Sequence, residues 1–441
     1  MIAEGVHSRR IFGSGVSVDL ARFMPEALVG RLSGIKIYFQ EGRRGRTLKL
    51  KYVAFASAPR LLLYHLSSLL EAEGGGGPAV LLASATSFLE ESPSYHIPVG
   101  PHIILKRENE IGAWRESEYL FSPVADPVDP RKNIRLSGAF EDRDRGIRAI
   151  IDHYFGSETP LVERMREDFD PGRRVGFVVN SYDQVRMIKE HVRKYHSAYA
   201  RRLIGVVDQI EDVPSSETSE WATASQVERL GSRDDWDAVV FPMRAIGRGV
   251  NIVYPDGPRK RDAVIGTVVF LMRPHPSIDS LGFTAGLAGR NALDFDRLQM
   301  PATANLEQVI ATWRSKRSHS LDLMRRLLRY PVQVGRLGPD LVVPFTADIM
   351  VDVIQTIGRA MRNGCRTRAI FVDEAWAPMS AVGKPDNMTS SMLVCMHDIL
   401  RKRLNDRDPV LRQTYKLLYE PFMHPLSRCT NLIFPNNEST E

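Results

Sequence analysis

The sequence predicts an α/β protein in which a mostly parallel sheet carries helices on both faces. From about residue 171, apolar runs typical of buried strands, such as "RRVGFVVN", "WDAVVFP" and "IGTVVFLMRP", alternate with runs of helical periodicity such as "SYDQVRMIKEHVRKYH". A further strand-like run, "RAIFVDEA", follows an apolar, helix-like segment near residue 350. Strands that alternate with helices in this way are typical of parallel sheets.

The chain has 441 residues, which is more than one ordinary core holds and indicates two or three domains. Near the N-terminus, residues 34–55 alternate around a Gly/Arg turn and predict a β-hairpin, and "PAVLLASAT" predicts a buried strand. A basic amphipathic run, "WRSKRSHSLDLMRRLLRY", predicts a helix where the strand–helix alternation is interrupted. We therefore expect a partial first lobe over 1–105, a linker over 106–170, a second lobe over 171–380 with an insertion at 275–345, and a helical tail over 381–441.

The composition is that of a soluble globular protein, with 43% hydrophobic and 25% charged residues. No apolar run reaches the roughly 18 to 20 residues that span a membrane, and "MIAEGVHSRR" lacks the apolar core of a signal peptide. The sequence thus favours a cytoplasmic protein without a membrane partner.

The net charge of +6 comes from 59 basic and 53 acidic residues, and arginine strongly outnumbers lysine. Arginine binds phosphate through a bidentate fork, so this composition suits a nucleotide or nucleic-acid partner, although genomic base composition explains it equally well. The three cysteines form no CxxC pair, so neither a disulfide framework nor a cysteine-rich metal site is expected.

The stretch "QTIGRAMRNG", residues 355–364, holds the candidate catalytic residues. On a helix, steps of four and three place Gln355, Arg359 and Arg362 on one face. Two adjacent guanidinium groups repel each other unless an anion compensates, and a phosphate chain is such an anion. Gly358 would let the helix approach a neighbour closely, and Gln355 would orient water. The alternative is a solvated basic helix face.

This stretch resembles motif VI of superfamily-two helicases, Q-x-x-G-R-x-x-R. A second stretch, "AIGRGVNI" at residues 245–252, resembles their motif V, in which glycine amides approach phosphate. The resemblance implies nucleotide-binding roles for Gly247, Arg248, Gly249 and Asn251, and for Gly358 of motif VI. Asn251 stands where the family usually has an aspartate, so its contact would lack the negative charge.

Two further stretches resemble motifs of this superfamily in the expected order. "VGFVVNSYDQV" resembles motif IV, with Ser181 and Tyr182 placed as in the damage-inducible and excision-repair branch. "LLASATS" resembles motif III, with Ser84 and Thr86 able to relay nucleotide state through hydrogen bonds. The resemblance implies a RecA-like second lobe of a P-loop NTPase, plus a remnant of the first lobe, and interlobe or nucleic-acid contacts for these four residues.

The insertion lies outside the family's usual compact spacing. Its Trp313 and Arg314, with Lys316 and Arg317, could contact nucleic acid by stacking and phosphate pairing. A solvated basic helix is the stronger interpretation of these four residues.

A phosphate-binding loop, G-x-x-x-x-G-K-[ST], and an acidic metal-binding motif are not found upstream of residue 84. The pair Asp373–Glu374 imitates the acidic motif, but it follows motif VI, where the family has none. We therefore expect the C-terminal motor portion of an ATP-dependent helicase, inactive alone, whose Arg359 and Arg362 serve an ATP site completed by a separate Walker A/B lobe. ATP and Mg²⁺ would bind only with that lobe, and we expect single-stranded DNA or RNA as the substrate.

Two other hypotheses remain open from the sequence. The chain could be a non-catalytic nucleic-acid-binding or scaffold protein built on a degenerate helicase lobe, which the absent phosphate loop favours. A nucleotide-binding α/β enzyme of another class is a weaker hypothesis, because no metal-ligand cluster or paired carboxylates support it.

Overall fold

The structure, a computed structural model, describes residues 32–42, 45–55, 63, 66–68, 74–75, 77–105, 114–138, 142–156, 160–246, 250–275, 282–296, 298–329 and 337–435. The chain divides into two compact units. Unit 1 comprises Met1–Pro98 and Ser277–Arg336, and unit 2 comprises Val99–Pro276 and Leu337–Glu441. Most of the segment predicted as an insertion therefore groups with the N-terminal part of the chain.

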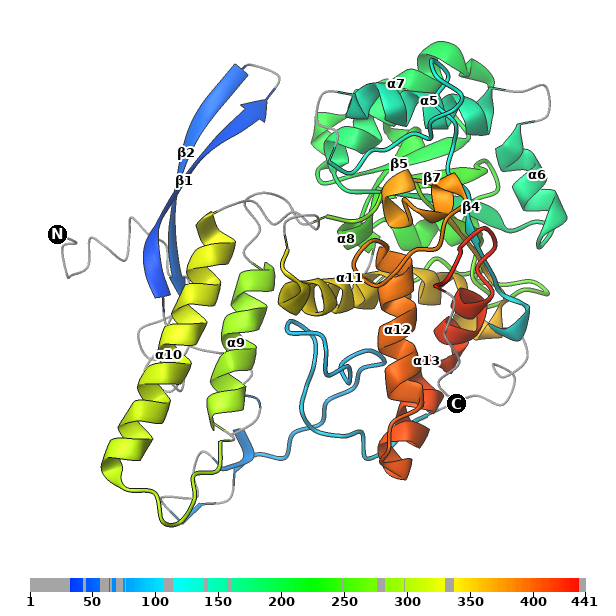
Figure 1. Ribbon diagram of the computed structural model, residues 1–441. Helices are drawn as coiled ribbons and strands as arrows, with labels where there is room; N and C mark the ends of the chain where they lie inside the picture. Colours follow the sequence, from blue (N-terminus) through cyan, green and yellow to red (C-terminus); the bar gives the residue numbers. More distant parts are fainter. Residues whose placement is uncertain are drawn as a thin grey trace. The chain divides into compact units, whose positions relative to one another are not determined.

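Unit 2 is built on a seven-stranded sheet in which neighbouring strands are all parallel (Figure 1). The strand order is β3-β9-β8-β4-β7-β5-β6. The strands are β3 (Glu118–Phe121), β4 (Arg174–Val179), β5 (Leu203–Val207), β6 (Trp221–Thr223), β7 (Ala238–Pro242), β8 (Ile265–Phe270) and β9 (Arg368–Phe371). The predicted class, α/β with a parallel sheet flanked by helices, is confirmed.

One face of this sheet packs against α5 (Arg143–Phe155), α6 (Leu161–Asp168) and α7 (Tyr182–Tyr195). Side chains alternate along a strand, so Val175, Phe177 and Val179 of β4 point to the same face. They join a buried cluster that includes Ile151 of α5 and Ile188 of α7. This cluster fixes α5 and α7 side by side.

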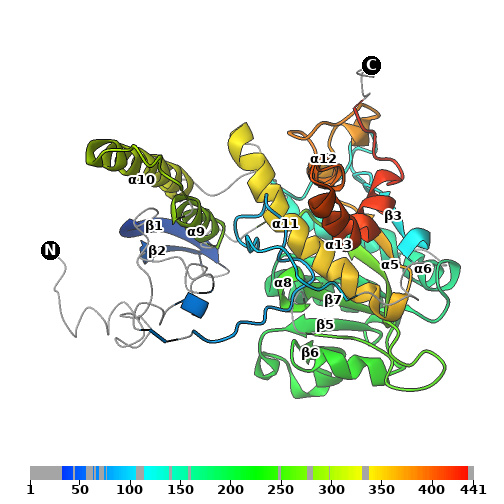
Figure 2. The same ribbon diagram turned by 90° about the horizontal axis from the view of Figure 1, so that it is seen from below.

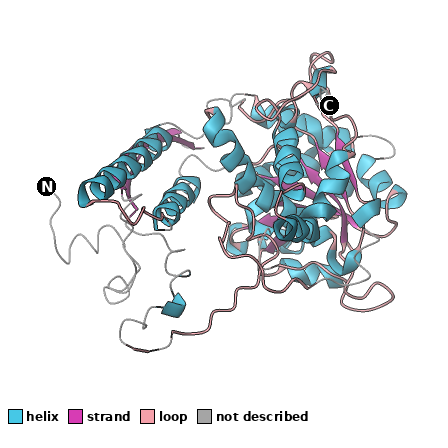
Figure 3. Ribbon diagram, turned by 60° about the horizontal axis from the view of Figure 1, so that its bottom comes forward, coloured by secondary structure: helices cyan, strands magenta, loops and turns pink. Residues whose placement is uncertain are grey.

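The opposite face packs against α11 (Pro339–Ala360), which lies on β8 (Figure 2). Helix α12 (Met392–Leu404) packs on α11, and α13 (Pro409–Ser427) packs on α12 and β3. On this side Phe270 and Phe371 stack with ring centroids 5.3 Å apart, and Trp376 contacts both rings. Because both faces are covered, the central strands are buried along their length, as their apolar sequences require (Figure 3).

Residues 106–170, predicted as a linker, contribute β3, α5 and α6 among their described residues. The prediction of a linker included neither β3 nor α6. Strand β3 has only four residues, and its burial alternates, so it lacks the continuous apolar run of the other strands. β3 is an outermost strand of the sheet, and it forms a strand because it pairs with β9.

Unit 1 contains the predicted hairpin of β1 (Leu32–Gly42) and β2 (Gly45–Phe55), paired from Leu32↔Phe55 to Gly42↔Gly45. It also contains α9 (Gly282–Asp296) and α10 (Leu306–Arg329), which pack together, and α10 confirms the predicted basic helix. The prediction of a buried strand at "PAVLLASAT" is wrong. Residues 78–83 are exposed and form no strand, with Leu81 94% exposed, and no described segment pairs with them (Figure 3).

Helix α11 is long and apolar enough to cross a membrane by length and composition alone. Two charged residues, Asp348 and Asp352, lie within this run, so it is not continuously apolar. In the structure 78% of its most apolar stretch is buried within the protein, as in a core helix.

Candidate nucleotide-phosphate site

The residues predicted to be catalytic lie where α11 ends. Gln355 and Arg359 share its last two turns, and both are half-buried. The helix stops at Ala360, and Arg362 begins a 3₁₀ turn in which Asn363 (φ 59°) and Gly364 (φ 77°) are left-handed. The prediction that Arg362 shares the helical face is therefore wrong, because α11 ends at Ala360 and its C-cap residue Met361, with φ −101° and ψ 9°, leaves the helical conformation before Arg362. Arg362 is exposed on the turn.

Arg359 lies beside Asn251, so residues of the stretches that resemble motifs V and VI come together. The Arg359 Nη1 donates to Asn251 Oδ1 at 3.5 Å, and the Asn251 backbone N–H donates to Glu228 Oε1 at 2.8 Å. Burial lowers the pKa of Arg359, and the positive charge of Arg362 lowers it further, while Glu228 acts in the opposite sense. The two cations thus disfavour each other, and an anion between them would relieve this repulsion.

Gly358 does not meet a neighbour closely in the structure. Among the residues that the structure describes, a Cβ built at this position would find only Phe422 Cζ within 4 Å, at 3.9 Å, which is an ordinary contact. The expectation that Gly358 serves close helix packing is wrong. Gly247, Arg248 and Gly249 lie outside the described residues.

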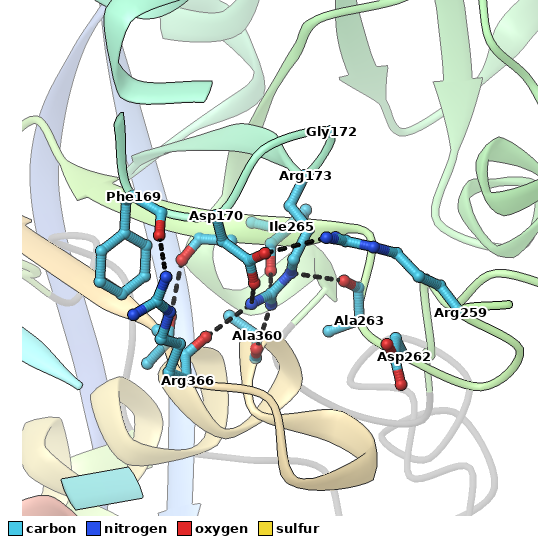
Figure 4. Close-up of polar contacts among 12 residues, drawn as sticks. Phe169, Asp170, Gly172, Arg173, Arg259, Asp262, Ala263, Ile265, Ala360 and Arg366 are labelled. Atoms are coloured by element: carbon cyan, nitrogen blue, oxygen red, sulfur yellow. Dashed lines mark hydrogen bonds and ion pairs between the residues drawn. The ribbon is translucent and has the colours of Figure 1, made fainter. Parts of the chain in front are cut away.

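A buried arginine, Arg173, holds the end of α11 in place (Figure 4). Its side chain is 1% exposed. Its Nη2 donates to the carbonyl oxygens of Ala360, the last residue of α11, and of Ile265, and its Nε donates to Ala263 O at 2.8 Å. Its Nη1 donates to Arg366 O at 2.6 Å and to Asp170 Oδ2 at 2.9 Å. All five N–H groups of the guanidinium are thereby used.

The turn that carries Arg362 is fixed by a second contact. Asn363 Nδ2 donates to Asp262 Oδ1 at 2.6 Å. Asp170, the carboxylate that pairs with Arg173, also accepts from Arg259 Nη2 at 3.1 Å (Figure 4). The loop before β8 therefore contacts both ends of the short segment from Arg359 to Asn363, through Asn251 at one end and Asp262 at the other.

Sequence reasoning missed Arg173, although a signal was present. It stands directly before a buried strand, three residues after Asp170, in "DFDPGRRVGFVV". An arginine next to a strand that is buried on both faces has to find acceptors, and an aspartate at this spacing is one. The carbonyl groups that complete the set come from distant segments, and they could not be inferred.

The predicted nucleic-acid contacts Ser181 and Tyr182 lie at the other edge of the sheet. Ser181 follows the carboxyl end of β4, whereas Arg173 precedes its amino end. The Ser181 hydroxyl accepts from the Gln184 N–H, and Gln184 Oε1 accepts from the Ser181 N–H at 3.2 Å, which is a capping box for α7. Burial and Asp208 raise the pKa of Tyr182.

The other predicted contacts belong to unit 1. Thr86 is buried and its N–H donates to the Ser84 hydroxyl at 3.3 Å. On α10, Arg314 is exposed, and Trp313 is half-buried with the guanidinium of Arg317 5.5 Å from its ring centroid. Trp313 and Arg317 thus contact each other on one helix.

The Asp373–Glu374 pair is a structural element at the carboxyl edge of the sheet. Asp373 is fully buried, and its two oxygens accept from the N–H groups of Leu136, Ser137, Arg273 and Ala375 and from the Ser137 hydroxyl at 2.6 Å. Five donors surround this carboxylate, so it does not fit a metal ion. This placement agrees with the interpretation of the pair as an imitation of an acidic motif.

The arrangement at the end of α11 can neutralise an anion. It combines a half-buried guanidinium, the Asn251 carboxamide beside it and a second guanidinium on the following turn. Arg173 holds the end of α11, and the Asn363–Asp262 contact fixes the turn. No protein-family model matches the chain, and no curated protein matches it.

Proposed function

We propose that this chain is the C-terminal motor portion of an ATP-dependent nucleic-acid helicase or translocase of superfamily two. Four stretches that resemble motifs III to VI follow one another in the family's order, and the parallel sheet is consistent with a RecA-like lobe. The observation that carries the proposal is the contact between Arg359 and Asn251, which joins the motif VI stretch to the motif V stretch.

In this proposal Arg359 and Arg362 neutralise charge that develops on the γ-phosphate of ATP. An arginine in such a position accelerates phosphoryl transfer by roughly 10³- to 10⁵-fold. Asn251 orients the Arg359 guanidinium, and Arg173 keeps the end of α11 rigid. Asp373 does not fit Mg²⁺, so both the phosphate-binding loop and the metal ligands would belong to a Walker A/B lobe outside these residues.

The first test concerns the missing lobe and needs only the adjacent coding sequence. An open reading frame encoding G-K-[ST] and a D-E box beside this chain supports the proposal. Its product, produced together with this chain, is then expected to hydrolyse ATP in the presence of single-stranded DNA or RNA.

The second test uses that complete enzyme. Arg359→Ala is expected to lower kcat for ATP hydrolysis by at least about 10³-fold, because charge neutralisation at the phosphate is lost. Binding of a fluorescent single-stranded oligonucleotide should remain largely intact. Arg401→Ala, which changes an exposed arginine of α12, is the matched control and should hydrolyse ATP at the wild-type rate. Wild-type hydrolysis by Arg359→Ala would refute the role of this residue.

A non-catalytic nucleic-acid-binding or scaffold protein is the second candidate. The exposed, strand-free course of residues 78–83 favours it, because the stretch that resembles motif III would lie at the end of a strand in a working first lobe. This candidate gains support if no Walker A/B partner is encoded nearby while the chain alone binds single-stranded oligonucleotides.

A further inference from the structure

Two histidines and an aspartate meet on the opposite side of the sheet from α11. Asp152 lies on α5, His191 lies on α7, and His196 is the first residue after α7. Asp152 Oδ1 is 2.6 Å from His191 Nε2 and 2.7 Å from His196 Nε2. The three potential ligand atoms all lie within 4.8 Å of one another.

The fold brings these groups together for reasons that do not depend on the groups themselves. The apolar cluster under α5 and α7, including Ile151 and Val192, holds the two helices side by side. On a continuous helix, residues five apart point about 140° away from each other. His196 lies just beyond the helix, with φ −133° and ψ 52°, so this separation does not apply to it. Its ring turns back toward Asp152.

The donor set is that of a transition-metal site. Imidazole nitrogen and carboxylate oxygen suit Zn²⁺ and other late first-row divalent ions, whereas Mg²⁺ and Ca²⁺ prefer oxygen ligands alone. One oxygen of the Asp152 carboxylate faces both Nε2 atoms, so an oxygen donor and two nitrogen donors converge on one place.

The three ligand atoms lie within 4.8 Å of one another, so the side chains would have to move to surround an ion. In a tetrahedral Zn²⁺ site with bonds of ~2.0–2.1 Å, ligand atoms lie about 3.3 Å apart. The Asp152 carboxylate would have to withdraw by a fraction of an ångström from each imidazole, and it is 49% exposed and has room to turn. The histidine side chains are 8% and 12% exposed, and the ring of His191 is held 4.8 Å from that of Tyr195.

We propose that Asp152, His191 and His196 form a binding site for one divalent transition-metal ion, with Zn²⁺ as the test ion and water in the remaining position. The ion would take the place of the two imidazole protons that now face Asp152 Oδ1. It would cross-link the C-terminal turn of α5 to the end of α7. The site is independent of the proposed motor function, because none of its residues belongs to the end of α11.

The test uses the full chain without a histidine tag, freed of metal by a chelator and titrated with Zn²⁺ by calorimetry. We expect one Zn²⁺ per chain, and no binding of Mg²⁺ at the same concentration. His191→Ala, His196→Ala and Asp152→Asn should each weaken Zn²⁺ binding by more than about 10- to 100-fold, the loss that removal of outer-shell partners alone causes. His153→Ala changes a neighbouring histidine of α5 outside the cluster, and it should bind like the wild type.

The result that overturns the proposal is a wild-type chain that binds no stoichiometric Zn²⁺, or binding that the three cluster variants retain. If a variant fails to fold by circular dichroism, X-ray absorption of the Zn²⁺-loaded wild type decides instead. Two imidazole nitrogens in the coordination sphere support the site, and fewer than two refute it. Zn²⁺ should also raise the Tm of the wild type and of His153→Ala, and leave that of His191→Gln unchanged.

Discussion

The amino-terminal edge of the sheet in unit 2 buries an arginine, and its carboxyl-terminal edge buries an aspartate. At the first edge, Arg173 gives all five of its N–H groups to oxygens of four different segments. At the second, Asp373 receives five donors, including the backbone N–H of Arg273 from the end of the neighbouring strand. At each edge, one fully hydrogen-bonded charged side chain therefore connects several segments of the chain.

The edges differ in what lies beside the buried charge. Next to Arg173, the segment from Arg359 to Asn363 carries two guanidinium groups, and burial and the charge of Arg362 lower the pKa of Arg359. Next to Asp373, Arg273 is buried and donates to the Ala375 carbonyl, and the charge of Asp373 opposes the lowering of the Arg273 pKa by burial and by Arg135. A buried charge that is hydrogen-bonded within the protein stabilises the fold. A half-buried cation beside another cation is suited to binding an external anion. The amino-terminal edge is therefore the better candidate for binding phosphate.

The largest expected effect comes from Arg173. Arg173→Met leaves the Asp170 carboxylate and the carbonyl groups at the end of α11 without their buried donor, which should destabilise the protein by about 3–5 kcal/mol. Arg173→Lys retains the charge but offers three donors instead of five, so its loss should be smaller. Urea unfolding measures both variants.

The control for Arg173 is the exposed Arg401→Met on α12, which should change the free energy of unfolding by less than about 0.5 kcal/mol. Hydrogen exchange of the last turn of α11 gives a second measurement, and it should speed up in Arg173→Met. Unchanged exchange in a folded variant would show that Arg173 does not position Arg359.

The next effect concerns the carboxyl edge. Asp373→Asn keeps the side-chain shape but turns one acceptor into a donor that faces other donors, so we expect a loss of about 2–3 kcal/mol in unfolding experiments. In the complete enzyme, the ATP hydrolysis of the folded fraction should be unaffected. A stable variant that had lost Mg²⁺-dependent hydrolysis would instead make Asp373 a metal ligand and reverse the comparison of the two edges.

The sequence predicted the parts of this fold that depend on local pattern. The strands β4, β7 and β8 are buried on both faces, so their apolar runs are continuous and were recognised, as were α7 and α10. Strand β3 was missed because its pairing with β9 involves residues about 250 positions away. Its four residues carry too little pattern to be recognised alone.

The candidate site could be predicted in part for the same reason. Gln355 and Arg359 follow from helical spacing, whereas the position of Arg362 depends on the non-helical conformation of Met361, which spacing ignores. The contact of Arg359 with Asn251 was not predicted, because the two residues lie 108 positions apart in the sequence. Arg173 and the Asp152–His191–His196 cluster depend on packing between distant segments, and no local pattern marks such a meeting.

The smallest expected effect is a pH-dependent change in stability that Glu374 causes at the carboxyl-terminal edge. Burial raises the pKa of Glu374 above its ordinary value of 4.5, and Arg135 only partly opposes this. A carboxyl group whose pKa is raised on folding favours the folded state below the unfolded pKa, and this contribution is lost as the pH rises through the folded pKa. Glu374→Gln should therefore be slightly more stable than the wild type at pH 7, by less than about 1 kcal/mol, with the advantage vanishing near pH 4.

Thermal melts at both pH values measure the difference. The control is Glu118→Gln, which changes a half-exposed glutamate paired with Arg368. A variant of Glu374 that is less stable at pH 7 would mean that the pair with Arg135 outweighs burial, and that the carboxyl edge gains from this charge as it gains from Asp373.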